Sequence, residues 1–110
     1  MVDATPPLLR VSVARSGDVA TIRLDGELDI ATAGQVEEAV GHLLESESPP
    51  RRIVVDADRL AFVDVSGLAP LTRAAHRLPS GGGIQLRNAR RQVVRVVRLL
   101  DLADQLGLDH

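Results

Sequence analysis

The spacing of apolar residues along this chain changes, in a defined order, between the two-residue period of a strand and the longer period of a helix. Residues 9–13 and 20–24 alternate apolar and polar side chains, and Ser16-Gly17-Asp18 between them has the composition of a tight turn. The two runs predict an antiparallel hairpin. Helical and strand-like segments alternate after it. This order predicts an α/β fold, with a mixed β-sheet that starts with the hairpin and is covered by about three to four helices.

Three segments repeat apolar residues at helical spacing. Their apolar positions are Val36, Val40, Leu43 and Leu44 in the first, Leu68, Leu71, Ala75 and Leu78 in the second, and Val93, Val97 and Leu100 in the third. We expect the first helix to begin with a capping box, in which Thr32 accepts a bond from the Gln35 N–H and Gln35 reaches back. We expect the second to begin at about Ser66. Two short strands, residues 53–55 and 84–86, separate the helices.

The chain has 110 residues, 45% of them hydrophobic, which suits a single compact domain. Residues 1–7 contain two prolines and no periodicity, so we expect a flexible lead-in to a domain over residues 8–110. Residues 102–110 are expected to add a last turn or a short strand. Cysteine is absent, which excludes disulfides and thiolate metal sites, so the core must be held by packing alone.

The charged and aromatic residues exclude several classes of function. The net charge is −2, so no global field would attract nucleic acid or an anionic membrane. Every basic residue is arginine and Phe62 is the only aromatic residue, so lysine chemistry and stacking platforms for single-stranded nucleic acid are absent. Residues 1–50 contain three arginines and nine acidic residues, whereas residues 51–110 contain ten arginines and six acidic residues. Such an uneven distribution of charge helps to orient a protein partner.

The chain also lacks the features of a membrane protein or a secreted protein. No apolar run approaches the roughly 20 residues that cross a bilayer, and the first residues do not have the order of a secretory signal. We therefore expect a cytoplasmic protein that acts on another protein, with no membrane, no direct nucleic-acid contact, no metal and no cofactor.

The segment Asp64-Val65-Ser66-Gly67-Leu68 places a hydroxyl group at the start of the second predicted helix. The simplest role of Ser66 is that of an N-cap, which is worth about 1 kcal/mol. An exposed serine at this position can also take a phosphate of roughly −1.5 to −2 charge, which the helix dipole would tolerate. With Asp64 beside it, the phosphate would make this patch strongly acidic. The added charge would then change the binding of any protein that docks at this patch.

Two motifs, GELDIAT from residue 26 and FVDVSGL over residues 62–68, resemble the STAS domain of anti-sigma factor antagonists. The resemblance covers nearly the whole chain. It implies a small binding protein that captures an anti-sigma factor when unphosphorylated and so releases a sigma factor. We expect this protein to be a monomer or a weak dimer. The anti-sigma factor commonly has the serine kinase activity that reverses the capture, and a phosphatase acting on the phosphoserine resets the switch.

The resemblance assigns roles to individual residues. Ser66 matches the phosphorylated serine, Asp64 the acidic residue before it, and Asp29 the loop aspartate at the edge of the docking surface. Gly67 and Leu68 match the start of the helix and are expected, with Asp29 and Asp64, to belong to the partner-binding surface.

Two residues depart from the family pattern. Val65 stands where many relatives have a second hydroxyl residue, and we include it in the partner-binding set. Pro70 falls in the first turns of the helix, where it is expected to shift the helix boundary by a residue or two.

Enzymatic roles for the same residues fit poorly. A nucleophilic Ser66 would need a glycine two positions earlier, but that position is Asp64. It would also need a nearby base, but His76 lies nearly three turns along the same helix and His42 is expected at the surface. Asp56 and Asp58 suggest a receiver or magnesium site, but a receiver also needs a lysine. We therefore expect a non-enzyme in which both aspartates lie in the connection over residues 56–65.

A glycine run and an arginine-rich helix face are also compatible with ligand or partner binding. Gly81-Gly82-Gly83 precedes a strand, so it predicts a turn rather than a phosphate loop. Arg91, Arg95 and Arg98 form one face of the third helix, which is either solvated or a contact for an acidic partner surface.

Two further functions are compatible with the sequence. One is a non-switching STAS accessory subunit of a larger complex such as a lipid-transport ATPase, in which Ser66 is only a cap. The other is binding of a nucleotide or another small ligand above the strand ends, although the chain has no dedicated phosphate loop.

Overall fold

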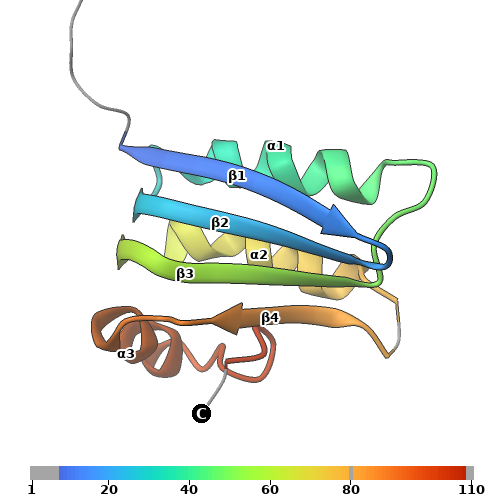
Figure 1. Cartoon of the computed structure of the whole chain (residues 1–110). Helices are drawn as coiled ribbons and strands as arrows, with labels where there is room; N and C mark the ends of the chain where they lie inside the picture. Colours follow the sequence, from blue (N-terminus) through green and yellow to red (C-terminus); the bar gives the residue numbers. More distant parts are fainter. Residues whose placement is uncertain (1–7, 80, 109–110) are drawn as a thin grey trace, which may run out of the picture.

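The computed structural model describes residues 8–79 and 81–108, and this part of the chain forms one mixed sheet and three helices (Figure 1). In chain order the elements are β1 (Leu9–Ser16), β2 (Val19–Leu28), α1 (Ala33–Leu44), β3 (Arg52–Val63), α2 (Val65–Arg77), β4 (Gly83–Arg87) and α3 (Arg91–Leu99). The predicted α/β class, hairpin and order of elements are confirmed. The lead-in predicted over residues 1–7 lies outside the described residues.

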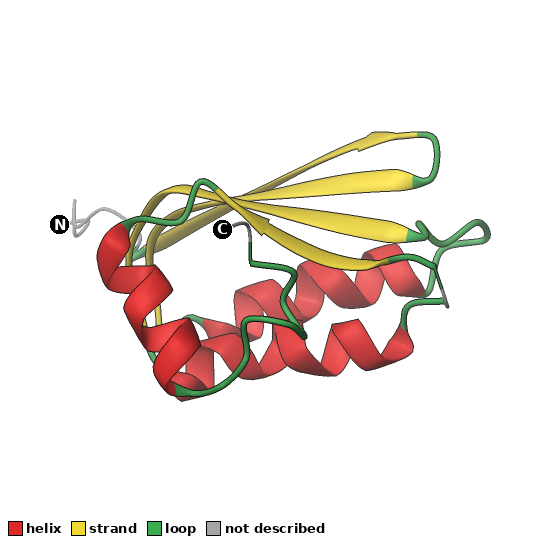
Figure 2. Cartoon of the chain, turned by 90° about the horizontal axis from the view of Figure 1, so that it is seen from below, coloured by secondary structure: helices red, strands yellow, loops and turns green. Residues whose placement is uncertain are grey.

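The strands are ordered β1-β2-β3-β4 across the sheet. β1 pairs antiparallel with β2 through a tight turn at Gly17, whose φ of 60° is in the left-handed region. β3 and β4 are added in parallel, each after a helix. Figure 2 shows α1 and α2 beneath one face of the sheet and α3 at one end. None of the helices in the described part of the chain is long and apolar enough to span a membrane.

The core lies between the sheet and its helices. Alternate residues of β2 and the first half of β3 point to this side, where they meet the apolar stripes of the helices. The side chains that are at most 2% exposed include Ala20, Ile22, Leu24, Ile53 and Val55 from the strands and Val36, Leu68, Leu71, Val93 and Val97 from the helices. Burying each Leu, Ile or Val contributes about 1.5–3 kcal/mol, so packing stabilises the domain without disulfides.

Strand β3 is much longer than the sequence predicts. Asp56 and Asp58 lie within the strand, so the expectation that they occupy a connecting loop is wrong. The register with β2 shifts twice: Arg23 faces Asp56, but Asp25 faces Arg59. An extra residue on β3 is taken up at each shift, as in a β-bulge. The bulges break the alternation of apolar and polar residues, which is why the sequence pattern ends the strand too early.

The predicted capping box of α1 does not form. Thr32 precedes the helix, as expected, but its side chain makes no cap bond. Its hydroxyl donates instead to the Glu27 carbonyl oxygen at 2.8 Å and accepts from the Asp29 N–H at 3.0 Å. Thr32 is 2% exposed, so these two bonds satisfy a buried hydroxyl group inside the loop after β2.

Residues 100–108 form turns rather than another helix or strand, in agreement with the expected last turn, and residues 109–110 lie outside the described residues. The Leu86 N–H of β4 donates to the Leu106 carbonyl oxygen at 2.8 Å, so this tail lies against the outer edge of β4. Leu106 and Leu108 are buried in the common core. The tail therefore covers an edge strand that would otherwise be open to pairing with other chains.

Candidate functional site

The carboxyl ends of β2 and β3 bring the two sequence motifs together at one end of the sheet. Leu28 is paired with Val63, and the Asp64 N–H donates to the Leu28 carbonyl oxygen at 3.2 Å. The loop after β2 and the start of α2 are therefore neighbours (Figure 1). Asp29 and Ser66, 37 positions apart in the sequence, belong to one surface region.

Gly67 sets how closely α2 approaches β2. A Cβ atom at this position would lie 2.2 Å from the Leu28 carbonyl oxygen, closer than any real contact. Leu68, the next residue, is 1% exposed and packs in the core. These two residues of the predicted partner-binding set therefore lie beneath the surface, where they hold the first turn of α2 in place.

Asp64, not Ser66, is the N-cap of α2. The Asp64 Oδ1 atom accepts from the Gly67 N–H at 2.8 Å, and the helix starts at Val65. The prediction that Ser66 caps the helix is wrong, because the residue with the extended cap conformation lies two positions earlier. Ser66 is the second helical residue, is half-buried, and its hydroxyl forms no hydrogen bond within the described residues.

Pro70 lies within the first turns of α2, as predicted. It is the sixth residue of the helix and is buried, and the helix start is not displaced toward it. Proline has no N–H to donate to the carbonyl four residues earlier, which belongs to Ser66. The first turn of α2 therefore lacks one of its regular backbone bonds at Ser66.

Asp29 shapes the loop beside Ser66. Its Oδ1 atom accepts from the Ala31 N–H at 2.9 Å and the Thr32 N–H at 3.2 Å, which forms an Asx-type turn. With the two Thr32 hydroxyl bonds, these contacts stabilise a tight loop between β2 and α1. Asp29 thus has a structural role in addition to its place at the predicted docking surface.

Large apolar side chains are exposed around this site. Ile30 is 78% exposed, Phe62 47% and Val65 60%. Ile30 lies in the loop that Asp29 shapes, and the other two residues flank Asp64 in the sequence. Exposed apolar side chains on the segments that carry Asp29 and Asp64 are of the kind that protein-binding surfaces use. Ile30 and Phe62 are not among the predicted site residues, although the only aromatic residue of the chain was a usable signal.

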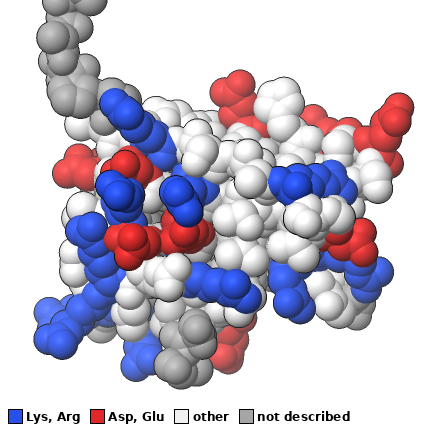
Figure 3. All heavy atoms as spheres, viewed as in Figure 1, with Lys and Arg blue, Asp and Glu red and all other residues white. Residues whose placement is uncertain are grey.

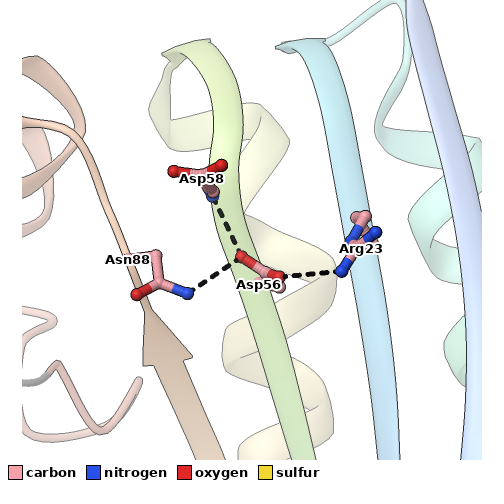
Figure 4. Close-up of polar contacts among 4 residues, drawn as sticks. All are labelled: Arg23, Asp56, Asp58 and Asn88. Carbon is pink, nitrogen blue, oxygen red and sulfur yellow. Dashed lines mark hydrogen bonds and ion pairs between the residues drawn. The ribbon is translucent and has the colours of Figure 1, made fainter.

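The acidic residues of β3 form a separate cluster on the helix-free face of the sheet (Figure 4). Asp56 Oδ1 accepts from the Asp58 N–H at 3.1 Å and the Asn88 amide at 3.2 Å, and Asp56 Oδ2 lies 3.5 Å from Arg23 Nη2. Burial raises the pKa of the Asp56 carboxyl, but these three partners lower it more, so its net pKa is lowered.

No group of three or more His, Cys, Asp or Glu side chains in the described part of the chain is arranged to hold a metal ion. His42 and His76 are both exposed, and His42 lies 4.0 Å from Glu38. Neither histidine forms a hydrogen bond with the Ser66 hydroxyl within the described residues.

Comparison with known proteins identifies the family. The model of the STAS domain family described as "Mlab, STAS domain" matches residues 11–108. The chain therefore belongs to the STAS domain family, and the resemblance inferred from the two motifs is confirmed.

The relatives include several antagonists of anti-sigma factors. Over 75 residues the chain is 29% identical to the anti-sigma-F factor antagonist RsfB of Mycobacterium tuberculosis, an alignment that covers 68% of this chain and 60% of RsfB. A crystal structure of an anti-sigma factor antagonist from Mycobacterium paratuberculosis superimposes with a TM-score of 0.76 at 24% identity, covering 91% of this chain and 84% of the other. The structure of unphosphorylated SpoIIAA of Bacillus also superimposes with a TM-score of 0.76, at 22% identity. The superposition covers 92% of this chain and 89% of SpoIIAA. The two structures show that the fold is shared.

Proposed function

We propose that this protein is an anti-sigma factor antagonist that binds an anti-sigma factor when unphosphorylated and is switched off by phosphorylation of Ser66. The observation that supports this proposal most directly is the state of Ser66. Its hydroxyl lies in the first turn of α2, half-buried and outside the capping bond that Asp64 makes. Family membership and the similarity to RsfB and SpoIIAA support the same function.

The exposed apolar residues supply the binding free energy in this proposal. Ile30, Phe62 and Val65 would be buried against the anti-sigma factor, and aromatic side chains often contribute most at such interfaces. The polar groups Asp29 and Asp64 lie among them and are engaged with the backbone, so they keep the surface rigid. A rigid surface loses little entropy on binding.

A phosphate on Ser66 would act on the partner and leave the fold intact. The free N–H groups at the start of a helix and its dipole favour an anion, so α2 would not melt. The added charge of roughly −1.5 to −2 would lie beside Asp64 and within an apolar contact region, where desolvation is costly. The partners in this proposal are an anti-sigma factor with serine kinase activity and a phosphatase, and the protein itself is not an enzyme.

The test is an affinity capture from host lysate with four baits: wild type, Ser66→Ala, Ser66→Asp and Ser12→Asp. Ser12 is exposed on β1, so its substitution adds the same charge away from the site. We expect a kinase-type anti-sigma factor on every bait except Ser66→Asp. Purified partner and ATP should then phosphorylate wild type but not Ser66→Ala. Recovery of the anti-sigma factor on all four baits would contradict the switch.

The family description favours one further candidate, because the matching model is named after Mlab rather than after an antagonist. In that case the protein is a constitutive STAS subunit of a larger complex such as a lipid-transport ATPase. The same experiment separates the two functions. A transport ATPase recovered equally on all four baits would support the constitutive subunit and leave Ser66 without a switching role.

A further inference from the structure

Helix α3 has a strongly basic exposed face. Arg91, Arg95 and Arg98 lie at i, i+4 and i+7 and are exposed, whereas Val93 and Val97 on the opposite side are buried. The nine residues of the helix include no acid. Basic side chains are visible around the end of the molecule where α3 lies (Figure 3).

The start of α3 is attached to β3 just before the Ser66 site. The Arg90 Nε atom donates to the Asp58 carbonyl oxygen at 2.9 Å, and the Gln92 amide donates to the Ala61 carbonyl oxygen at 3.4 Å. Figure 1 shows α3 at the same end of the molecule as the carboxyl ends of β2 and β3.

The basic face is close enough to Ser66 for one partner to contact both. Ala61 and Ser66 are five residues apart, so their Cα atoms are separated by at most about 18 Å. A protein interface of standard size covers about 800 Å² on each partner, a patch about 30 Å across. A contact patch of this width that lies between Ser66 and Ala61 would include both Ser66 and the start of α3.

The fold itself does not account for Arg91 and Arg95. Within residues 8–79 and 81–108 neither side chain forms a hydrogen bond or ion pair, whereas Arg73 is paired with Glu37 at 3.1 Å. Arg91 is the first residue of α3, where the helix dipole disfavours a cation, and like charges at i and i+4 repel. Both placements cost stability, and an acidic partner surface would offset that cost.

We propose that Arg91 and Arg95 form a cationic rim of the docking surface and bind an acidic patch on the anti-sigma factor. This inference rests on the proposed function, because it adds a second contact region to the surface around Ser66. Charges at the rim of an interface mainly change the association rate and its salt dependence. The rim would thus speed capture and orient the partner, while the apolar residues hold it.

The test compares two double variants that change net charge equally. Arg91→Glu with Arg95→Glu removes the rim, and Arg52→Glu with Arg77→Glu is the control. Arg52 starts β3 and Arg77 ends α2, so both control positions lie at the opposite end of the sheet and helix from Ser66, and both are exposed. Association rates with the purified anti-sigma factor are measured at low, physiological and high NaCl, about 0.05, 0.15 and 0.5 M, which span the range over which salt screens exposed charges. Circular dichroism checks folding.

We expect the rim variant to associate about tenfold more slowly than the control at the lowest salt, with the difference falling below about twofold at the highest as salt screens the charges. Equal rates for the two folded variants would overturn the rim while leaving the Ser66 switch intact. An anti-sigma factor that does not bind wild type at all would overturn both proposals. If the rim variant associates more slowly than the control by the same factor at every salt concentration, that result would also contradict an electrostatic rim.

Discussion

At the scale of single residues, Gly67 has little freedom to change. The Leu28 carbonyl oxygen occupies the space in which a side chain at this position would begin, and the Leu28 Cγ atom would lie 2.8 Å from an added Cβ. This close approach is what holds the start of α2 against the end of β2. The position of Ser66 therefore depends on a residue that has no side chain.

We predict that Gly67→Ala lowers the free energy of unfolding by about 1–3 kcal/mol, because the backbone must move to admit the methyl group. The matched control is Gly41→Ala in α1, where an added Cβ meets nothing within 4 Å. That change should instead stabilise the protein by about 0.5–1 kcal/mol, since alanine favours a helix more than glycine does. Urea denaturation followed by circular dichroism measures both. Similar effects of the two substitutions would contradict this account.

Asp56 makes the stability depend on pH. The pKa of this carboxyl group is 3.8 in the unfolded state and lower in the folded state. The folded state therefore favours the ionised carboxylate more than the unfolded state does. The stabilisation is therefore fully present above pH 3.8 and is lost as the pH falls through the lower pKa of the folded state. We predict that the stability difference between wild type and Asp56→Asn is largest above about pH 5 and shrinks as the pH falls below the unfolded-state pKa.

Urea unfolding from about pH 2.5 to about pH 7 measures this difference across the range in which the carboxylate titrates. Asp58→Asn is the control, because it removes a neighbouring exposed carboxylate and keeps the backbone N–H that bonds Asp56. A wild-type minus Asp56→Asn difference that is constant over this range would refute the role of the Asp56 cluster.

At the scale of elements, the segment after α3 completes the sheet. Leu106 is fully buried although it belongs to a turn, and a Cβ at Gly107 would lie 2.2 Å from the Ile84 carbonyl oxygen. The segment thus packs tightly on β4. It also shields the outer edge of that strand, because Leu86 donates its N–H to it.

We predict that Leu106→Ala costs about 2–5 kcal/mol, as expected for removing a buried leucine. Leu99→Ala is the matched control, since Leu99 is 78% exposed at the end of α3. Its effect should stay within about 0.5 kcal/mol. Thermal or urea unfolding measures the two changes. A Leu106→Ala variant as stable as Leu99→Ala would show that the tail is not part of the cooperative core.

At the scale of the whole molecule, the fold separates two surfaces of different character. One face of the sheet and all three helices enclose a continuous core, and the other face is free of helices in the described part of the chain. The site lies at the end of the sheet, where the ends of two parallel strands, a loop and a helix start meet. Ligand sites in α/β folds commonly lie at the carboxyl ends of parallel strands.

The fold determines where the unevenly distributed charges of the two halves of the sequence lie on the surface. The acids of residues 1–50 include Glu37 and Glu38 on α1, whereas the basic half contributes α3 next to the site. Helix α3 thus carries a local basic patch although the net charge of the protein is only −2. A weak net charge with separated patches favours orientation of a partner over general attraction.

Sequence alone determined the order of the elements, the hairpin, the apolar stripes and the region of the site. These features depend on local periodicity and on two short motifs, so neighbouring residues suffice to reveal them. Ser66, Asp64 and Asp29 were predicted in this way as candidate site residues, and the structure brings their segments to one end of the sheet.

Tertiary structure decided the features that depend on residues far apart in the sequence. The bulges that extend β3 require β2 beside it, and Thr32 is drawn away from capping α1 by the Glu27 carbonyl and the Asp29 N–H within the folded loop. The exposure of Ile30 and Phe62 likewise depends on what packs around them. Side-chain composition reports what a residue can do, but only the folded chain determines which partners lie within reach.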